Sequence, residues 1–381
     1  MQVNQDTSSL KRSSYVPEFE SLRGLMALWV LLGHVASRIG IHFSSELSVF
    51  WKAIASINIP VDIFIALSGF AIFTLLSKDK SDYPSYLLGR FFRIYPVYIT
   101  CLMIGVLLYD WRIAQLMIDP LVSPQGLQSK LLVFESVQQH YWQHLLAHLF
   151  VLHGVIPDQL LFAAGHSFLA PAWSLSLEWQ FYLLAPLLFF LMTRSKISAI
   201  VIGLSLIALD LALRWGGLTF SYGAFLPVKI GFFFAGMAVF FFRNEEKAIA
   251  SILMGMALIQ ACLSDNYKAA ILSLILWLTM SFIILRHSGV GSSFTRSIRA
   301  VLASEKLKYL GKLSFSIYLL HVIIIDIVAS YLLQFPILHL SQLQIYLLLL
   351  IPTLLFTFLC AMTIHHLIEA PFIKLGKKFR K

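Results

Sequence analysis

The 381-residue sequence has little charge and few cysteines. Charged residues account for only 13% of it, about half their share in a typical soluble domain, whereas hydrophobic residues account for 59%. This composition excludes a single soluble globule. The three cysteines, Cys101, Cys262 and Cys360, lie far apart in apolar runs and form no CxxC spacing. We therefore expect no disulfide framework, zinc cluster or other bound metal.

The sequence also lacks the features of a secretory leader. Residues 1–21 are polar, and no small-residue cleavage site follows the first apolar block, so we expect no signal peptide. We recognise no internal repeat and no appended soluble domain. We divide the chain into a polar cytoplasmic segment at 1–14, a membrane domain at 15–373 and a basic cytoplasmic tail at 374–381, which would anchor the topology at anionic lipid.

What the sequence does contain is a series of long apolar blocks with the charges between them, a pattern typical of a multi-pass membrane protein in a lipid bilayer. We expect an all-α bundle of about ten transmembrane helices. The expected spans are 22–40, 58–77, 94–109, 171–192, 197–213, 225–242, 249–264, 269–285, 308–333 and 344–368.

The net charge of +10 is distributed as a topology signal. Lys and Arg lie in the gaps between apolar blocks, so we do not expect a nucleic-acid partner. When alternate gaps are assigned to opposite sides, 22 of the 29 basic residues fall on one side. By the positive-inside rule, both termini are therefore cytoplasmic. The seven basic residues of the other side are Arg38, Lys52, Arg112, Lys130, Arg214, Lys229 and Lys268.

The longest gap, an external loop near 110–170, is rich in histidine. His140, His144 and His148 repeat every fourth residue, so they would share one face of a helix. A metal site is one interpretation of this spacing. We prefer an amphipathic helix at the membrane interface.

Ionisable residues in membrane spans are costly and commonly mark a functional interior. Arg23 precedes His34 by eleven residues in ESLRGLMALWVLLGH, which places both side chains on one side of a helix about 16.5 Å apart along its axis. At mid-depth, the neutral imidazole of His34 could accept a proton from a hydroxyl. A helix–helix hydrogen bond is the equal alternative.

Two arginines begin the third expected span. Arg90 and Arg93 are three residues apart in GRFFRIYP, so one helix face would present two guanidinium groups to phosphates. Arginine beside a span is also an ordinary topology signal. Together with Arg23 on the same side, the pair suggests a phosphate-rich cytosolic ligand.

A polar stripe enters the fourth expected span. Ser174, Glu178 and Tyr182 are successive i, i+4 neighbours. Glu178 would lie about 10 Å below the external surface, at a depth comparable to that of His34. Its carboxylate could orient that imidazole or bind acceptor hydroxyls, and a structural polar contact is the alternative.

Further polar residues lie in three other spans. Ser314, Tyr318 and His321 share one face of the ninth expected span, where they would line the same cavity or pack between helices. Asp62 lies shallow on the external side of the second span and is another possible cavity residue. A last group, His365, His366 and Glu369, lies at the cytoplasmic end of the last span. For these residues we prefer the interpretation that they anchor the helix at the membrane interface.

Six motifs in register resemble one family. The order ESLRGLMALWVLLGH, VDIFIALSGF, GRFFRIYP, WSLSLEWQFY, LSFSIYLLH and IEAPF is similar to that of the family-3 membrane acyltransferases over residues 15–375. Arg23 and His34 match the family's Arg-x10-His signature, and Arg90 and Arg93 match its Arg-x-x-Arg signature. Ser174, Glu178, Phe181 and Tyr182 match a Ser-x-x-x-Glu-x-x-Phe-Tyr pattern.

The resemblance implies that His34 is catalytic and that the arginines bind acyl-coenzyme A, with acetyl-coenzyme A as the default co-substrate. It implies an acceptor that is a sugar hydroxyl of a glycan or lipid-linked sugar, such as lipopolysaccharide O-antigen, and a bacterial cytoplasmic membrane. Some family members carry an extra hydrolase-like domain. We expect a stand-alone form here, because only a basic tail follows the last apolar block.

The residues and the resemblance together predict one scheme. His34 would act as general base on the acceptor hydroxyl or carry the acyl group itself, and Glu178 would orient the imidazole or the acceptor. A transporter or flippase for a lipid-linked sugar, with a His/Glu proton relay, is the main alternative. A pH sensor is a second alternative, and it predicts no turnover.

Overall fold

The structure is a computed structural model that describes residues 16–40, 49–122, 124–285, 293–332, 334–335 and 339–379. Within these ranges the chain is almost entirely helical and contains no strand, as the predicted all-α bundle requires. The expected N-terminal segment at 1–14 lies outside the described residues. So do three of the basic residues used for the topology, Lys11, Arg12 and Arg286, and the last two of the tail.

Nine of the described helices are long and apolar enough to cross a membrane. They are α1 (Pro17–Arg38), α3 (Asn58–Leu76), α4 (Tyr83–Leu107), α8 (Ala172–Arg194), α9 (Lys196–Trp215), α10 (Leu226–Arg243), α12 (Tyr267–Leu285), α14 (Glu305–Leu332) and α15 (Gln342–Ile364). The tenth expected span is α11 (Lys247–Cys262), which has only 16 residues. Its length is about 24 Å, against about 30 Å for a bilayer core.

Polar side chains set the starts of several spans. Asp82 caps α4 by accepting a hydrogen bond from the Ser85 backbone N–H at 3.1 Å. Ser195 caps α9 in the same way, and Ser341 and Gln344 form a capping box at the start of α15. Such caps satisfy N–H groups that a helix leaves unpaired at its first turn. They also place these helix starts in the polar segments between the apolar blocks.

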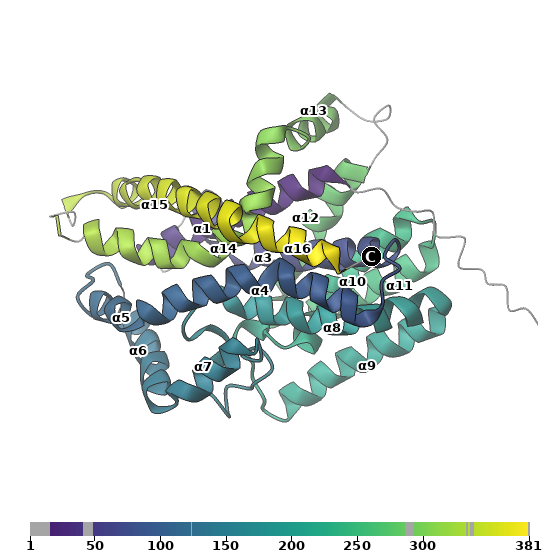
Figure 1. The fold of residues 1–381 in the computed structure, drawn as a ribbon, viewed down its shortest axis with the longest axis horizontal. Coiled ribbons are helices and arrows are strands. Elements are labelled where there is room, and N and C mark those ends of the chain that lie inside the picture. The colour runs from purple at the N-terminus through teal and green to yellow at the C-terminus, as the bar shows by residue number, and fades with distance from the viewer. Residues whose placement is uncertain are drawn as a thin grey trace, which may run out of the picture.

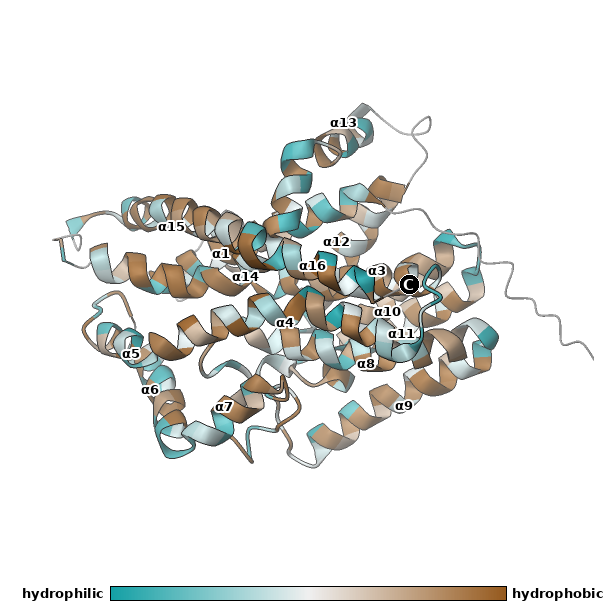
Figure 2. Ribbon diagram, in the orientation of Figure 1, coloured by the Kyte–Doolittle hydropathy of each residue, from teal (hydrophilic) through white to brown (hydrophobic). Residues whose placement is uncertain are grey.

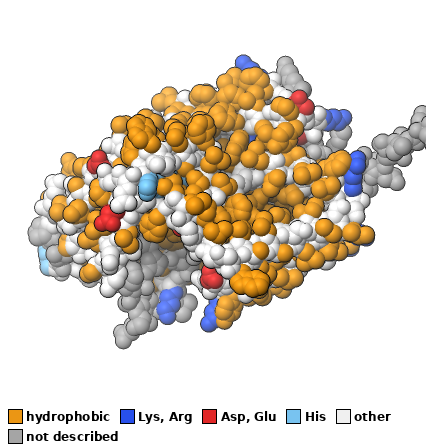
Figure 3. Space-filling view, turned by 90° about the horizontal axis from the view of Figure 1, so that it is seen from below, with side chains coloured by type: hydrophobic (Ala, Val, Ile, Leu, Met, Phe, Trp, Pro, Cys, Tyr) orange, Lys and Arg blue, Asp and Glu red, His pale blue; other side chains and the backbone are white. Residues whose placement is uncertain are grey.

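The long helices form one bundle, with α13 (Ser293–Leu302) projecting from it (Figure 1). The outer helices α9 and α15 are hydrophobic along most of their length (Figure 2). Seen from below, hydrophobic side chains cover most of the visible face and only a few charges interrupt them (Figure 3). This surface suits contact with lipid, because the apolar residues that a soluble protein would bury face outward.

Helices α1 and α14 run parallel and pack closely against each other. A Cβ atom added to Gly24 of α1 would lie only 2.8 Å from the backbone nitrogen of Gly311 in α14. Glycine therefore allows the two backbones to approach closely here. Further along the pair, the rings of His34 and His321 are in contact, and Arg38 pairs with Asp326. The shared direction of the two helices brings residues far apart in sequence to the same depth.

The expected external loop near 110–170 contains three helices, α5 (Tyr109–Met117), α6 (Pro124–Gln139) and α7 (Tyr141–Leu149), and a 3-10 turn, η2 (Ala164–His166). They gather at one end of the bundle (Figure 1). The prediction that three histidines share one helix face is wrong in one respect. The helix breaks at His140, which is exposed between α6 and α7, whereas His144 and His148 are fully buried.

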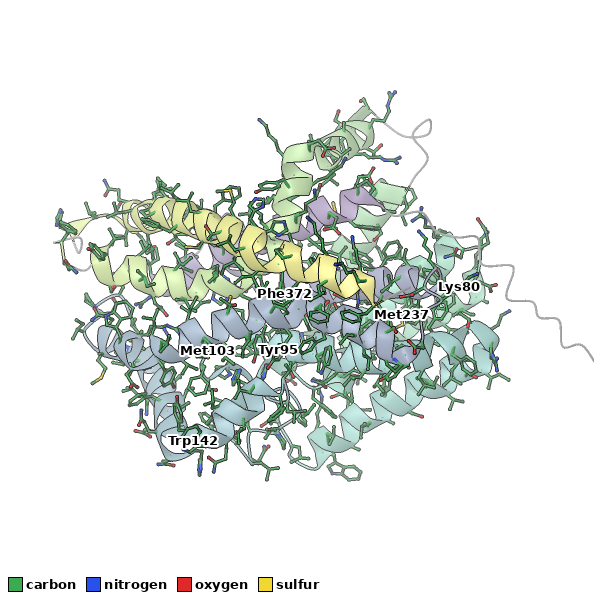
Figure 4. All side chains as sticks on the ribbon, viewed as in Figure 1. Lys80, Tyr95, Met103, Trp142, Met237 and Phe372 are labelled. Atoms are coloured by element: carbon green, nitrogen blue, oxygen red, sulfur yellow. The ribbon has the colours of Figure 1, made fainter. Side chains whose placement is uncertain are left out.

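Helix α7 packs Leu145, Ala147 and Leu149 inward and leaves other large apolar side chains on the surface. Trp142, Leu146 and Phe150 are exposed, and Trp142 lies at the edge of the molecule (Figure 4). Its two histidines face inward, where the rings of His148 and His153 stack at 4.1 Å. Among the described residues, no group of three or more His, Cys, Asp or Glu side chains could hold a metal ion.

Candidate active site

A cavity inside the bundle gathers most of the predicted site residues. Helices α1, α3, α4, α8, α10 and α14 enclose about 770 Å³, part of which is open to the outside. We call this space the first cavity. Seven of the predicted residues line it, namely Arg23, Arg93, Ser174, Glu178, Tyr182, Ser314 and Tyr318. The cavity therefore joins two arginines at one end to hydroxyl and carboxyl groups deeper in the bundle.

The stripe on α8 faces the first cavity as its spacing predicted. Glu178 accepts hydrogen bonds from the Ser68 hydroxyl at 2.7 Å and from the Tyr182 hydroxyl at 2.5 Å. Ser174 donates to the Tyr318 hydroxyl of α14 at 2.9 Å. These bonds fix the carboxylate and two hydroxyls on rigid helices, which is how a preorganised polar site is built.

Ser68 is a site residue that the sequence analysis did not identify. It lies in α3 and lines the first cavity beside Glu178. The signal that could have found it is its hydroxyl in the apolar run IFIALSGF. A serine in such a run costs little, however, because it can bond the carbonyl of its own helix, so the residue type alone is weak evidence of a site.

The paired arginines separate in the structure. Arg93 lines the first cavity with Arg23, whereas Arg90 is not part of the lining and places its guanidinium 5.9 Å from the centre of the Tyr182 ring. Arg93 forms an ion pair with Glu369 at 2.9 Å. Two guanidinium groups do line one cavity. They belong to Arg23 of α1 and Arg93 of α4, and not to the predicted pair Arg90 and Arg93 on one helix face.

Glu369 is not an interface anchor, and this prediction is wrong. It is fully buried, accepts from Arg93 at 2.9 Å and from the Ser316 hydroxyl at 3.3 Å, and lies 2.9 Å from Nδ1 of His365. The physical reason is the π-helical turn His365–Glu369 between α15 and α16 (Ala370–Lys378). Helix α16 then lies along α4, where the Phe372 ring is 6.1 Å from that of Phe92 (Figure 4).

The two predicted histidines lie next to the first cavity and not in its lining. Their rings are 4.9 Å apart. His321 is fully buried, and its Nδ1 lies 2.7 Å from the Tyr318 carbonyl oxygen. With the proton on Nδ1, Nε2 is an acceptor without a hydrogen-bond partner among the described residues. His34 is half-buried.

Glu178 does not orient His34 directly. Within the described chain, its hydrogen bonds go to Ser68 and Tyr182. The contacts that lead from the α8 stripe to the histidines run through other groups. Ser174 bonds Tyr318, the Tyr318 ring is 5.9 Å from that of His321, and His321 contacts His34.

Asp62 belongs to another polar group, contrary to the expectation that it lines the same cavity. It pairs with Lys229 of α10 at 2.8 Å and accepts from the Ser273 hydroxyl of α12 at 3.1 Å. A buried carboxylate needs such partners, because its desolvation is expensive. Asp62 therefore holds α3 against α10 and α12.

A second cavity lies toward the end of the bundle that carries α5 and α6. It is lined by residues of α5, α6 and α14 and by parts of the segments before α8 and α10, and it encloses about 1070 Å³, part of which is open to the outside. Val322 lines the second cavity and Tyr318, one turn earlier on α14, lines the first. Likewise, Ala170 lines the second cavity and Ser174, four residues later, lines the first. The two cavities are thus stacked about one helical turn apart, at the level of His321.

Two comparisons with known proteins bear on this arrangement. A family model described as an acyltransferase domain matches residues 16–365. The acyltransferase MdmB of Streptomyces mycarofaciens is 29% identical over 177 residues, which is 45% of this chain and 38% of that protein. The matched segment thus spans well under half of the length of this relative. No solved structure matches the chain.

Proposed function

The chain belongs to the family-3 membrane acyltransferases, and from this premise we propose that it is an O-acyltransferase working across a bacterial cytoplasmic membrane. The acyl group, acetyl by default, comes from cytosolic acyl-coenzyme A. The acceptor is a hydroxyl of a glycan or lipid-linked sugar on the other side, such as lipopolysaccharide O-antigen. The supporting observation is the pair of cavities stacked about one helical turn apart at the level of His321, whose ring contacts that of His34.

The first cavity suits the donor. Its arginine end lies on the side that the positive-inside rule assigns to the cytoplasm. Guanidinium groups bind phosphates with paired hydrogen bonds, and Arg23 and Arg93 supply two of them from different helices. Glu369 holds Arg93 in place through its ion pair. The cavity leads from there to Ser174 and Tyr318, so a thioester threaded along it reaches the level of the histidines.

The chemical step is the attack of the acceptor oxygen on the thioester carbonyl. His34 takes the hydroxyl proton as the new C–O bond forms, the C–S bond breaks, and coenzyme A leaves as a thiol once it recovers that proton. His321, in ring contact with His34, is a positioning residue for it. An acyl-histidine intermediate on His34 is the variant of this step, with the same proton balance overall.

The Tyr318 hydroxyl is suited to the oxyanion, because the Ser174 hydroxyl donates to it and so leaves the Tyr318 proton for the substrate. The two hydroxyls lie 2.9 Å apart, and both line the first cavity. Donors fixed before the reaction stabilise developing negative charge without having to reorganise. In this scheme Glu178 positions the hydroxyls of Ser68 and Tyr182 along the donor path.

The test uses purified protein in nanodiscs with radiolabelled acetyl-coenzyme A and membrane glycans. Wild type is compared with His34→Ala and with His339→Ala, a control that removes an exposed histidine that lines neither cavity. We expect wild type and the control to release coenzyme A and label the glycan, and His34→Ala to lose about 10²- to 10⁴-fold in rate. A wild type that consumes no short acyl-coenzyme A contradicts the donor assignment and favours the transporter alternative.

A further inference from the structure

The second cavity has an excess of positive charge. Its lining includes Arg112, Lys130 and Asp326. Arg112 and Asp326 form an ion pair at 2.6 Å, whereas Lys130 forms no ion pair with any described residue. The lining therefore keeps one cation whose charge is not neutralised by contact. Lys130 is also exposed, so a dissolved ligand can reach it.

A further ion pair behind the lining does not cancel this excess. Arg38 is buried and pairs with Asp119 and, at 3.7 Å, with Asp326. The five-residue group of Arg38, Arg112, Lys130, Asp119 and Asp326 thus holds three cations and two carboxylates. Nη1 of Arg38 has no hydrogen-bond partner among the described residues. The first turn of α6 also borders the cavity at Gly126, and the positive end of its helix dipole adds to the same potential.

The ring of Tyr222 forms part of the wall of the second cavity. Tyr222 is 58% exposed and has a left-handed backbone, with φ of 56°. A non-glycine residue in this conformation costs about 1–3 kcal/mol, and such residues occur in turns and cluster at functional sites. The Tyr222 ring stands edge-on to His166 at 4.8 Å and is stacked with Trp173 at 5.8 Å. An exposed aromatic face of this kind is a flat apolar surface for the C–H groups of a sugar ring.

His166 offers a neutral polar contact beside this wall. Its Nδ1 is buried without a hydrogen-bond partner among the described residues, and the residue lines the second cavity. Burial lowers the pKa of His166 to about 4. The imidazole is therefore uncharged at neutral pH and can bond a hydroxyl group.

We propose that the second cavity is the acceptor site and that it takes an anionic sugar, one that carries a carboxylate or a phosphate ester. Lys130 and Arg112 face the anionic group, and the Tyr222 ring contacts the sugar. This inference rests on the proposed function, because the hydroxyl that reacts must reach His34. The position fits that need: Asp326 lines the cavity and pairs with Arg38, one turn beyond His34 on α1.

The experiment measures sugar binding directly, so it does not depend on turnover. Full-length protein in nanodiscs is titrated with methyl glucoside, methyl glucuronide and methyl glucoside 6-phosphate, and binding is followed by saturation-transfer NMR. The last two probes distinguish a carboxylate from a phosphate ester. The variants are Lys130→Gln, the charge reversal Lys130→Glu, the conservative Lys130→Arg, and Lys268→Gln, a matched control at an exposed lysine outside the cavity lining.

We expect wild type to bind at least one anionic glycoside about tenfold more tightly than the neutral one. Lys130→Gln should remove this preference and Lys130→Glu reverse it, whereas Lys130→Arg and the control keep it. Equal binding of all three sugars by wild type, no binding of either anionic sugar, or the same response to Lys130→Gln and Lys268→Gln would overturn the proposal. Release of coenzyme A from acetyl-coenzyme A in the same samples reports separately on the proposed function.

Discussion

The rings of His34 and His321 lie 4.9 Å apart across the parallel pair α1 and α14. These residues are separated by most of the chain, yet they meet where His34, near the end of α1, faces His321, near the middle of α14. The contact depends on the glycine approach at Gly24 and Gly311, because that approach sets how close the two backbones run. The histidine pair is therefore a property of the packing between α1 and α14.

The first prediction concerns His321. In His321→Asn the amide can still donate to the Tyr318 carbonyl as Nδ1 does now, but nothing replaces Nε2. We expect kcat to fall about tenfold, or about 1.4 kcal/mol in the barrier, because the ring contact that positions His34 is lost, with the KM for acetyl-coenzyme A unchanged. Steady-state kinetics in nanodiscs test this. A change in KM alone would place His321 in donor binding instead.

The second prediction concerns Arg23, which makes no ion pair with a described residue but lines the first cavity. Arg23→Gln should raise the KM for acetyl-coenzyme A about ten- to hundredfold, because a charge-assisted bond to phosphate is lost. Arg296→Gln, at an exposed arginine of α13, is the control. Measuring KM for 3′-dephospho-acetyl-coenzyme A as well tests whether Arg23 binds the 3′-phosphate of the donor. If Arg23 binds that phosphate, the variant and the truncated donor will not have additive effects.

The third prediction concerns the buried ion pair of Arg93 and Glu369. Glu369→Ala leaves Arg93 without its buried counter-charge, and we expect it to lower the free energy of unfolding by about 3–5 kcal/mol. Glu305→Ala removes a carboxylate whose side chain is 88% exposed in its pair with Lys308, and should cost at most about 1 kcal/mol. Unfolding in mixed detergent, followed by tryptophan fluorescence, compares the two. Equal losses would show that the burial of Glu369 contributes nothing.

The fourth prediction concerns the hydroxyl pair of Ser174 and Tyr318. Both single variants, Ser174→Ala and Tyr318→Phe, should lower kcat. In the double variant the losses should overlap, with a coupling energy of about 0.5–3 kcal/mol, because the two hydroxyls share one hydrogen bond. A double-mutant cycle on kcat/KM measures the coupling. Strictly additive losses would mean that the two hydroxyls act independently.

The fifth prediction is a pH dependence of stability from the histidines between α6 and α8. Burial lowers the pKa of His144 and of His153 from 6.5 to about 4. The unfolded chain therefore binds more protons between these values, and stability falls as the pH drops from about 6.5 to about 4, by up to about 1.4 kcal/mol per pH unit for each histidine. His153→Gln should flatten the slope of Tm against pH in this window.

The matched control for that measurement is His339→Gln, since His339 is exposed and lies outside the segment between α6 and α8. We expect it to leave the slope as in wild type. A slope that is unchanged in His153→Gln, or reduced equally in both variants, would assign the acid sensitivity to another group.

The sequence predicted the features that depend on local pattern. Apolar runs located the spans, and i, i+4 spacing placed Ser174, Glu178 and Tyr182 on one face of α8. Both signals are carried by neighbours along a helix, so they can be read without knowing the fold. The break at His140 was missed because the four-residue spacing of histidines continues across it.

The features that depend on contacts between distant segments could not be predicted. Arg93 and Glu369 are 276 residues apart, and a π-helical turn aims Glu369 inward. As an ionisable residue in an apolar span, Asp62 was expected to line a cavity. Its partners, however, come from α10 and α12. Hydropathy gives the number and length of the helices. It does not give their order around the bundle, which decides the partner of each buried charge.

The short helix α11 has a consequence for the membrane around it. Its 16 residues span about 24 Å, and its outer face carries exposed Leu258 and Ile259. Lipids beside it must compress by several ångströms to cover both the helix and its longer neighbours, at a modest cost for each ångström of mismatch. We therefore expect the bilayer to be thinner beside α11 than beside its longer neighbours, and thin-bilayer lipids to collect there.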